Sequence, residues 1–198
     1  MKTFLSMTKR NIKLFFKDKG MFFTSLITPV ILLVLYSTFL AKVYRDSFTS
    51  ALPEGFGVSD KLIGGMVGGE LFSSLLAVCC VTVAFCSNLL MVQDKVSGVR
   101  KDFDITPTKK STLAISYYVS SLLTTLIISL VATFASFAYI AIQGWFLSFG
   151  DVMLILLDVF MLTMFGTALS SVINFFLSTN GQASAVGTIV SAGYGFVC

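Results

Sequence analysis

Histidine is absent from this sequence, and none of its four cysteines forms a C-x-x-C pair. Metal and redox sites are usually built from histidines or closely spaced cysteines, so both kinds of site are disfavoured. The lack of histidine and of paired carboxylates at one depth also disfavours an intramembrane enzyme. The cysteines all lie inside apolar segments, which favours roles as small packing residues; they are Cys79, Cys80, Cys86 and Cys198.

Charge is also scarce. Charged residues make up 12% of the 198 residues, against roughly 25% in a typical soluble domain. Beyond Lys110 there is no lysine or arginine, and the only acids there are Asp151 and Asp158. The apolar runs are continuous rather than alternating, which indicates several transmembrane helices instead of a soluble core or a β-barrel. The bases flank these runs without forming a soluble module, so we expect no nucleic acid among the partners.

The apolar runs predict an all-α fold, a polytopic transmembrane helix bundle that forms a single domain over residues 1–198. A final run of about 16 residues would rise only about 24 Å, less than the roughly 30 Å of bilayer hydrocarbon. We therefore expect it to be a partial fifth span, and the sequence to be truncated in or after that helix. The predicted spans cover residues 21–41, 71–92, 113–142, 152–177 and, in part, 183–198.

The N-terminal segment, residues 1–19, predicts a basic amphipathic helix that lies in the membrane interface with its lysines toward anionic lipid headgroups. The alternative is a positively charged tail that only sets the topology. Gly20 is the expected break before the first span. The apolar stripe contains Met1, Phe4, Leu5, Ile12, Phe15 and Phe16, and the polar face contains Lys2, Ser6, Lys9, Arg10, Lys13 and Lys17.

The placement of bases predicts the topology, because basic segments stay on the cytoplasmic side. Residues 1–19 carry six bases, and residues 93–112 carry five. Residues 42–70, the expected outer loop, carry three bases and four acids, and the connection over 143–151 carries no base. We therefore expect a multi-pass protein of the cell membrane whose N-terminus and residues 93–112 are cytoplasmic.

Residues 93–112 form the longest densely charged stretch between two apolar runs, and we expect them to carry a short helix. Gly98 permits a tight turn. Pro107 restricts the backbone conformation of the segment that leads into the next span. An ordinary solvated loop is the alternative.

This stretch, and the order of the elements around it, resemble the permease subunit of type-2 ABC transporters, a family of exporters. The resemblance is carried by Asp94-Lys95-x-x-Gly98, by Lys101-Asp102-Phe103, and by Thr106-Pro107 followed by a basic pair. The first 19 residues look like the connecting helix of that family. A repeat of small residues in the last run looks like its fifth helix; the repeat is Ala183, Gly187, Ser191 and Gly195.

The resemblance implies six spans, of which about five are present, and a dimer with a second permease copy or homologue. It also implies a separate ABC ATPase subunit that binds ATP and Mg, since this chain has no G-x-x-x-x-G-K-[ST] motif. We therefore expect this chain to bind no cofactor and to be no enzyme itself. The residues implied to contact the ATPase are Asp94, Lys95, Gly98, Val99, Lys101, Asp102, Phe103 and Pro107.

Three polar residues inside the predicted spans are candidates for a translocation pathway. Asp158 is the strongest, because an acid within a span is costly, although it can also be a structural acid that reaches outward to water. Asn88 and Asn174 fit interhelical hydrogen bonds better than substrate contacts.

The favoured function is therefore an ATP-driven export permease that couples to a separate ATPase. One alternative is a non-transporting membrane scaffold or immunity-type protein. The other is a secondary transporter driven by protonation of Asp158, which the scarcity of intramembrane ionisable groups weakens. The apolar spans do not identify the transported substrate.

Overall fold

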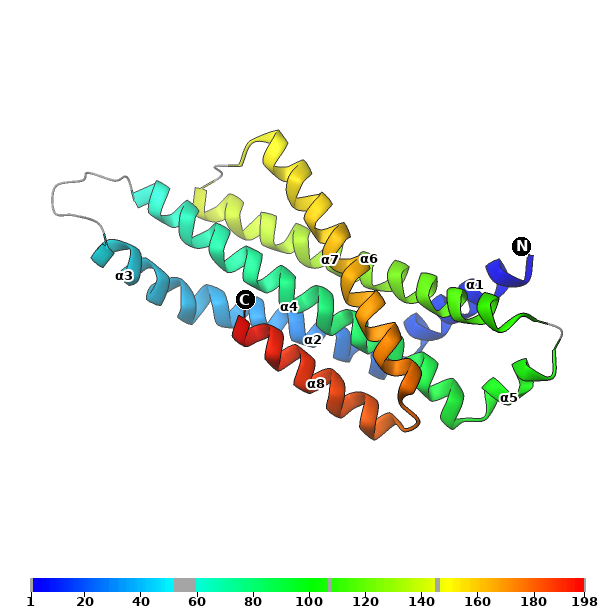
Figure 1. Ribbon diagram of the computed structural model, residues 1–198. Helices are drawn as coiled ribbons and strands as arrows, with labels where there is room; N and C mark the ends of the chain where they lie inside the picture. Colours follow the sequence, from blue (N-terminus) through cyan, green and yellow to red (C-terminus); the bar gives the residue numbers. More distant parts are fainter. Residues whose placement is uncertain (1, 52–59, 107, 145–146, 198) are drawn as a thin grey trace.

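The computed structural model describes residues 2–51, 60–106, 108–144 and 147–197, and every regular element within them is a helix (Figure 1). The all-α prediction is confirmed. In chain order the elements are α1 (Lys2–Lys17), α2 (Lys19–Leu35), the π-helical η1 (Tyr36–Leu40), α3 (Ala41–Ala51), α4 (Asp60–Val96), α5 (Val99–Asp104), α6 (Lys110–Gly144), α7 (Phe149–Phe176) and α8 (Asn180–Val197).

Within the described residues, four helical stretches are long and apolar enough to cross a membrane. They are Lys19–Ser50, Ile63–Val96, Lys110–Ala141 and Phe149–Phe176. Each of them overlaps one of the four full spans predicted from the sequence, with boundaries that differ at both ends. The predicted partial span is a helix of 18 residues, α8, and is not one of the four.

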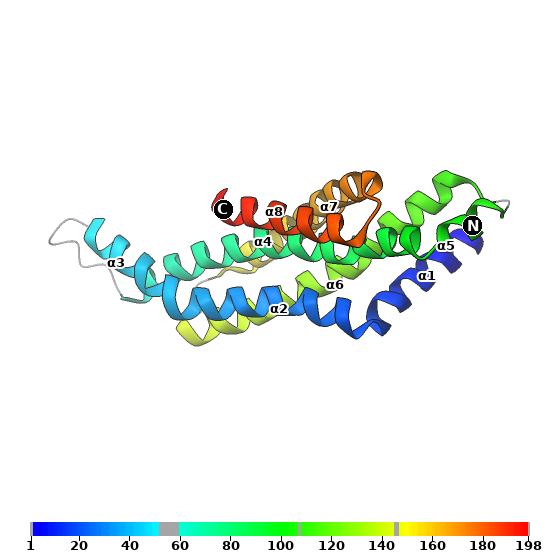
Figure 2. The same cartoon turned by 90° about the horizontal axis from the view of Figure 1, so that it is seen from below.

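Helix α4 runs through the middle of the bundle and contacts most of the other helices (Figures 1 and 2). Its central turns are completely buried, from Cys79 to Ala84 with only Thr82 slightly exposed. On one side Gly166 of α7 packs directly against its backbone: a Cβ at Gly166 would lie 3.2 Å from the Cys80 carbonyl oxygen. A side chain at this position would be crowded against the α4 backbone, and small residues at such close approaches are typical of membrane helix pairs.

Hydroxyl and amide groups hold the buried faces of α4, α6 and α7 together. The Ser87 hydroxyl lies 2.6 Å from that of Ser121 on α6. One residue further, the Asn88 amide donates to the Ser170 hydroxyl of α7 at 2.5 Å and to that of Ser171 at 2.9 Å. These are the hydrogen bonds that join membrane helices when hydrophobic burial cannot, and the predicted interhelical role of Asn88 is confirmed.

The small-residue repeat of the last helix faces α4. Ala183 is buried, and a Cβ at Gly187 would touch Phe85 of α4 at 3.6 Å. Thr82 of α4 donates a hydrogen bond to Ser191 at 3.0 Å. The packing role predicted for Ala183, Gly187 and Ser191 is confirmed, and α4 is the helix that they contact; the surroundings of Gly195 lie outside what the structure describes.

The prediction of an outer loop over residues 42–70 was wrong for most of its length. Residues 42–51 belong to α3 and residues 60–70 to α4, and only 52–59 lie outside the described residues. The two helices are stabilised by an apolar cluster in which Ile63 and Val67 pack against Tyr44 and Phe48. Residues spaced by four lie on one face of a helix, and their burial outweighs the glycines and charges that had suggested a loop.

The N-terminal helix forms as predicted, but its buried face differs from the predicted stripe. Phe15 and Met7 are buried together with Thr8 and Asn11, whereas Leu5 is 68% exposed. The reason is that α1 packs along α6 instead of facing only lipid. It also ends earlier than expected, because the Asp18 carboxylate accepts the Met21 N–H at 3.2 Å and caps α2, so that Gly20 lies inside α2.

Candidate functional site

The predicted coupling loop lies at the end of the bundle where α1 and α5 meet, opposite α3 (Figure 1). Gly98 has φ of 83°, a left-handed conformation that glycine adopts without steric cost. The chain therefore turns sharply after α4 and enters α5, the short helix predicted for this stretch. Pro107 falls outside the described residues.

Asp94, at the end of α4, points into the protein. Its carboxylate accepts two hydrogen bonds from the Arg10 guanidinium of α1, at 2.9 and 3.2 Å, and a third from the Tyr117 hydroxyl of α6. The Asp94 side chain is 8% exposed and that of Arg10 is 33% exposed. The hydrogen bonds that Arg10 donates to the Asp94 carboxylate raise the pKa of Arg10 above its usual value. Asp94 therefore joins α1, α4 and α6 and is not available to a partner protein.

Lys95 points to the other side of α4 and binds the C-terminal end of α7. Its ammonium group donates to the carbonyl oxygens of Asn174, Phe175 and Leu177, at 3.0, 2.6 and 2.9 Å. These are carbonyls that a helix end leaves without intrahelical partners. Lys95 thus caps α7, and its three donors are all used inside the chain.

Phe103 anchors α5 to the bundle. Its ring packs against a buried cluster of Met7, Met91, Leu113 and Tyr117, and the Arg10 guanidinium lies 5.4 Å from the ring centroid. Arg10 therefore contacts both Asp94 and α5, so the orientation of α5 depends on the same ion pair.

Other predicted contact residues of this loop face outward. Lys101 and Asp102 are exposed, and Val99 is half-buried. Sequence reasoning missed Ile105, which is 85% exposed directly after α5. A single exposed apolar residue is common on protein surfaces, so Ile105 is of interest only because it lies beside the exposed charges of α5, and it leaves a weak signal in a sequence. We call Lys101, Asp102 and Ile105 the α5 outer face.

The three candidates for a translocation pathway lie in different surroundings. Asn88 and Asn174 are both buried. The Asn174 side-chain amide has no hydrogen-bond partner among the described residues, so the interhelical hydrogen bond predicted for Asn174 is not formed. Asp158 is exposed, at about 13 Å along α7 from its first residue. It lines an open groove of about 450 Å³ between α4 and α7, whose other walls are mostly apolar.

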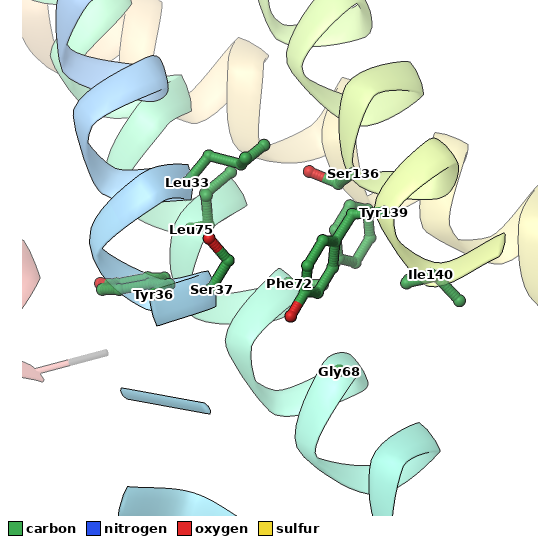
Figure 3. Close-up of a pocket in the computed structure, with 9 residues that line it drawn as sticks. All are labelled: Leu33, Tyr36, Ser37, Gly68, Phe72, Leu75, Ser136, Tyr139 and Ile140. Carbon is green, nitrogen blue, oxygen red and sulfur yellow. The ribbon is translucent and has the colours of Figure 1, made fainter. Parts of the chain in front are cut away.

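A larger groove, of about 580 Å³, runs between α2, α4 and α8. Apolar residues dominate its walls, and hydroxyl groups from α2, η1, α4 and α8 interrupt them; these are Thr24, Tyr36, Thr82, Ser184, Thr188 and Ser191. A small pocket between α2, η1, α4 and α6 has little free volume, about 20 Å³, which suits a single water molecule. Tyr36 and Tyr139 lie on different sides of it (Figure 3).

Among the described residues, no group of three or more histidine, cysteine or acidic side chains is arranged to hold a metal ion.

The fold defines a multi-pass helical membrane protein, and comparison with protein families gives its class. The model of the ABC-2 type transporter family matches residues 2–194. The chain therefore belongs to the ABC-2 type transporter membrane family and is a permease component of an ABC transporter; this family implies an ABC ATPase as a partner. Comparisons with curated proteins and with solved structures gave no match.

The ion pair at the end of α4 yields a first prediction. Arg10→Gln and Asp94→Asn should each lower the free energy of unfolding by about 2 kcal/mol, somewhat less than for a fully buried pair because Arg10 is partly exposed. The double variant should lose about 1 kcal/mol less than the sum, because it leaves no unpaired charge. Denaturation of the detergent-solubilised protein measures this cycle. Lys13→Gln, on the exposed side of α1, is the control, and strictly additive losses would contradict the pairing.

Proposed function

We propose that this chain is the permease subunit of an ATP-driven exporter, and that α5 is the helix that docks on the ATPase. The proposal rests on one observation: some residues of the loop bind the rest of the chain, and others face outward. Asp94, Lys95 and Phe103 bind the rest of the chain, while Lys101, Asp102 and Ile105 face outward. A helix that transmits force needs both a rigid base and a free contact surface.

The geometry suits the transmission of a rigid-body motion. Packed helices and buried hydrogen-bonded groups deform little, so a displaced short helix moves the elements to which it is bound. Here Arg10 contacts Asp94 of α4 and the Phe103 ring of α5, and the Tyr117 hydroxyl links the same carboxylate to α6. Closure of an ATPase against the α5 outer face would therefore move α1, α4 and α6 together.

The remaining parts of the assembly follow from the family. ATP and Mg bind to the ATPase subunit, and a second permease copy or homologue completes a dimer in the cell membrane. The N-terminus and α5 lie on the cytoplasmic side, where the bases gather. The exposed face of α1, which carries Lys9, Lys13 and Lys17, contacts lipid headgroups.

For the translocation pathway, we propose the two grooves that flank α4 as candidate surfaces. The groove between α2, α4 and α8 offers hydroxyl groups within apolar walls, and the groove between α4 and α7 offers the Asp158 carboxylate. Apolar walls with a few polar groups are typical of sites for small molecules. Asn88 and Asn174 are buried and would reach a solute only if α4 and α7 separated.

Reversing the charges of the α5 outer face tests the docking proposal. Lys101→Glu with Asp102→Lys should abolish co-purification of the ATPase and its stimulated ATP hydrolysis, because the charge pattern of the contact is inverted. Thermal stability of the permease should not change, since both side chains are exposed. The matched control is Lys42→Glu with Asp46→Lys on the exposed side of α3, at the other end of the bundle. Normal assembly and hydrolysis in the α5 variant would exclude α5 as the docking helix.

The role of Asp158 is tested by Asp158→Asn, which keeps the shape of the side chain and removes its charge. We expect transport into inside-out vesicles to fall while the amount of permease in the membrane stays normal. Asp151→Asn is the control, because Asp151 lies on the same helix but only caps its first turn, accepting the Ser148 N–H at 2.8 Å. Unchanged flux in Asp158→Asn would remove this residue from the pathway.

A further inference from the structure

Two bases of the loop that carries α5 bind the end of α7, a helix on the opposite side of α4 from α1. We infer that Lys95 and Arg100 are positioning residues that transmit the displacement of α5 to α7 and, through the short connection that follows, to α8. The inference rests on the proposed docking of α5. It adds a second set of contacts by which a displacement of α5 reaches the bundle, separate from the contacts through Arg10 and Asp94.

The contacts of Lys95 are made almost entirely with backbone. Three carbonyl oxygens at the end of α7, those of Asn174, Phe175 and Leu177, surround its ammonium group within 3.0 Å. Backbone acceptors have no side-chain freedom, so a shift of Lys95 is passed directly to the α7 main chain. Hydrogen bonds with a charged donor are among the strongest in proteins.

The Phe175 ring adds the contact to α5 itself. The Lys95 ammonium lies 5.5 Å from the ring centroid, and the Arg100 guanidinium lies 5.9 Å from it. Both distances are within the range of cation–π attraction. Because Arg100 belongs to α5 and Lys95 to α4, one ring of α7 contacts both helices.

The composition of the chain explains why α7 depends on a base from another helix. A cation near a helix C-terminus offsets the helix dipole, but α7 has no base in its last turn and the sequence has none after Lys110. Lys95 supplies this charge from α4.

The connection from α7 to α8 is short and hydrogen-bonded. The Ser178 N–H donates to the Gln182 side-chain oxygen, and the Gln182 N–H donates to the Thr179 hydroxyl, both at 3.3 Å. Helix α8 begins at Asn180 and packs on α4 beside the groove shared with α2. A shift of the α7 end would therefore reposition one wall of that groove.

The experiment compares the nucleotide response of two reporter cysteines in the complex of the full chain with its ATPase. Gly181→Cys reports on the start of α8, where a Cβ added at Gly181 would meet no atom of another part of the chain within 4 Å. Ser111→Cys reports on the exposed start of α6. The measured quantity is the rate of maleimide labelling without nucleotide and after trapping with ATP and vanadate. The parent chain gives the background from the native cysteines, of which Cys79 and Cys80 are buried.

With Lys95 present, both reporters should change their labelling rate on trapping. In Lys95→Met the change at position 181 should be lost while that at 111 remains, and Lys95→Arg should restore it because a guanidinium can donate to the same carbonyls. Lys109→Gln, a base of the same loop that is exposed, should leave both responses intact. If Lys95 had only a structural role, Lys95→Met would lower the stability of the protein and would change the responses at positions 181 and 111 in the same way.

A response at 181 that persists in Lys95→Met would overturn the inference. A response at 111 alone, with Lys95 in place, would also overturn it but would leave the proposed docking of α5 intact. If neither position responds to trapping, both the inference and the proposed docking of α5 are overturned. If Lys95→Met does not assemble, Arg100→Gln with Phe175→Leu removes contacts of a half-exposed ring, and an undiminished response at 181 in that variant would contradict the inference.

Discussion

The structure depends on the need to neutralise charge at the point where a central membrane helix leaves the bundle. Asp94 and Lys95 are neighbours on α4 and point to opposite sides, one to Arg10 and Tyr117 and the other to the end of α7. A buried carboxylate without such partners would cost several kcal/mol. Satisfying these two charges fixes α1, α6 and α7 around the same turn of α4. Helix α5 starts at Val99, four residues after Lys95, on this rigid base.

This arrangement gives the loop between α4 and α6 its two functions. Phe103 and Arg100 bind inward, to the core cluster and to Phe175, while the α5 outer face is left free. For a permease that receives its motion from another chain, as proposed, a free contact surface on a rigid base is the physical requirement. The grooves along α4 lie further along the same helix, so the surface that would meet the ATPase and the walls that would meet the solute share one element.

The sequence allowed the helical class, the four full spans, the turn at Gly98 and the packing face of α8 to be predicted, because each depends on local composition and spacing. The helices over 42–51 and 60–70 were missed, since the cluster that stabilises them joins Tyr44 and Phe48 to Ile63 and Val67 across a segment rich in glycine and charge. The pairing of Arg10 with Asp94, 84 residues apart, leaves no local signal. The binding of Lys95 to the end of α7 also leaves no signal in the sequence, because its acceptors are backbone carbonyls that any residue could supply. The short helix after Gly98 therefore forms where it was predicted, but three residues predicted to contact a partner, Asp94, Lys95 and Phe103, make their contacts within the chain.

The most direct test of the account is a photo-crosslink from the α5 outer face. A photoreactive phenylalanine analogue at Ile105, which is 85% exposed, should form a covalent adduct with the ATPase subunit when the membrane complex is irradiated. The same analogue at Ile189, which is 70% exposed on α8, should form none. An adduct at position 105 would place α5 against the ATPase. Crosslinking only to lipid or to a second permease at that position, in a complex that contains the ATPase, would contradict the assignment of α5 as its docking helix.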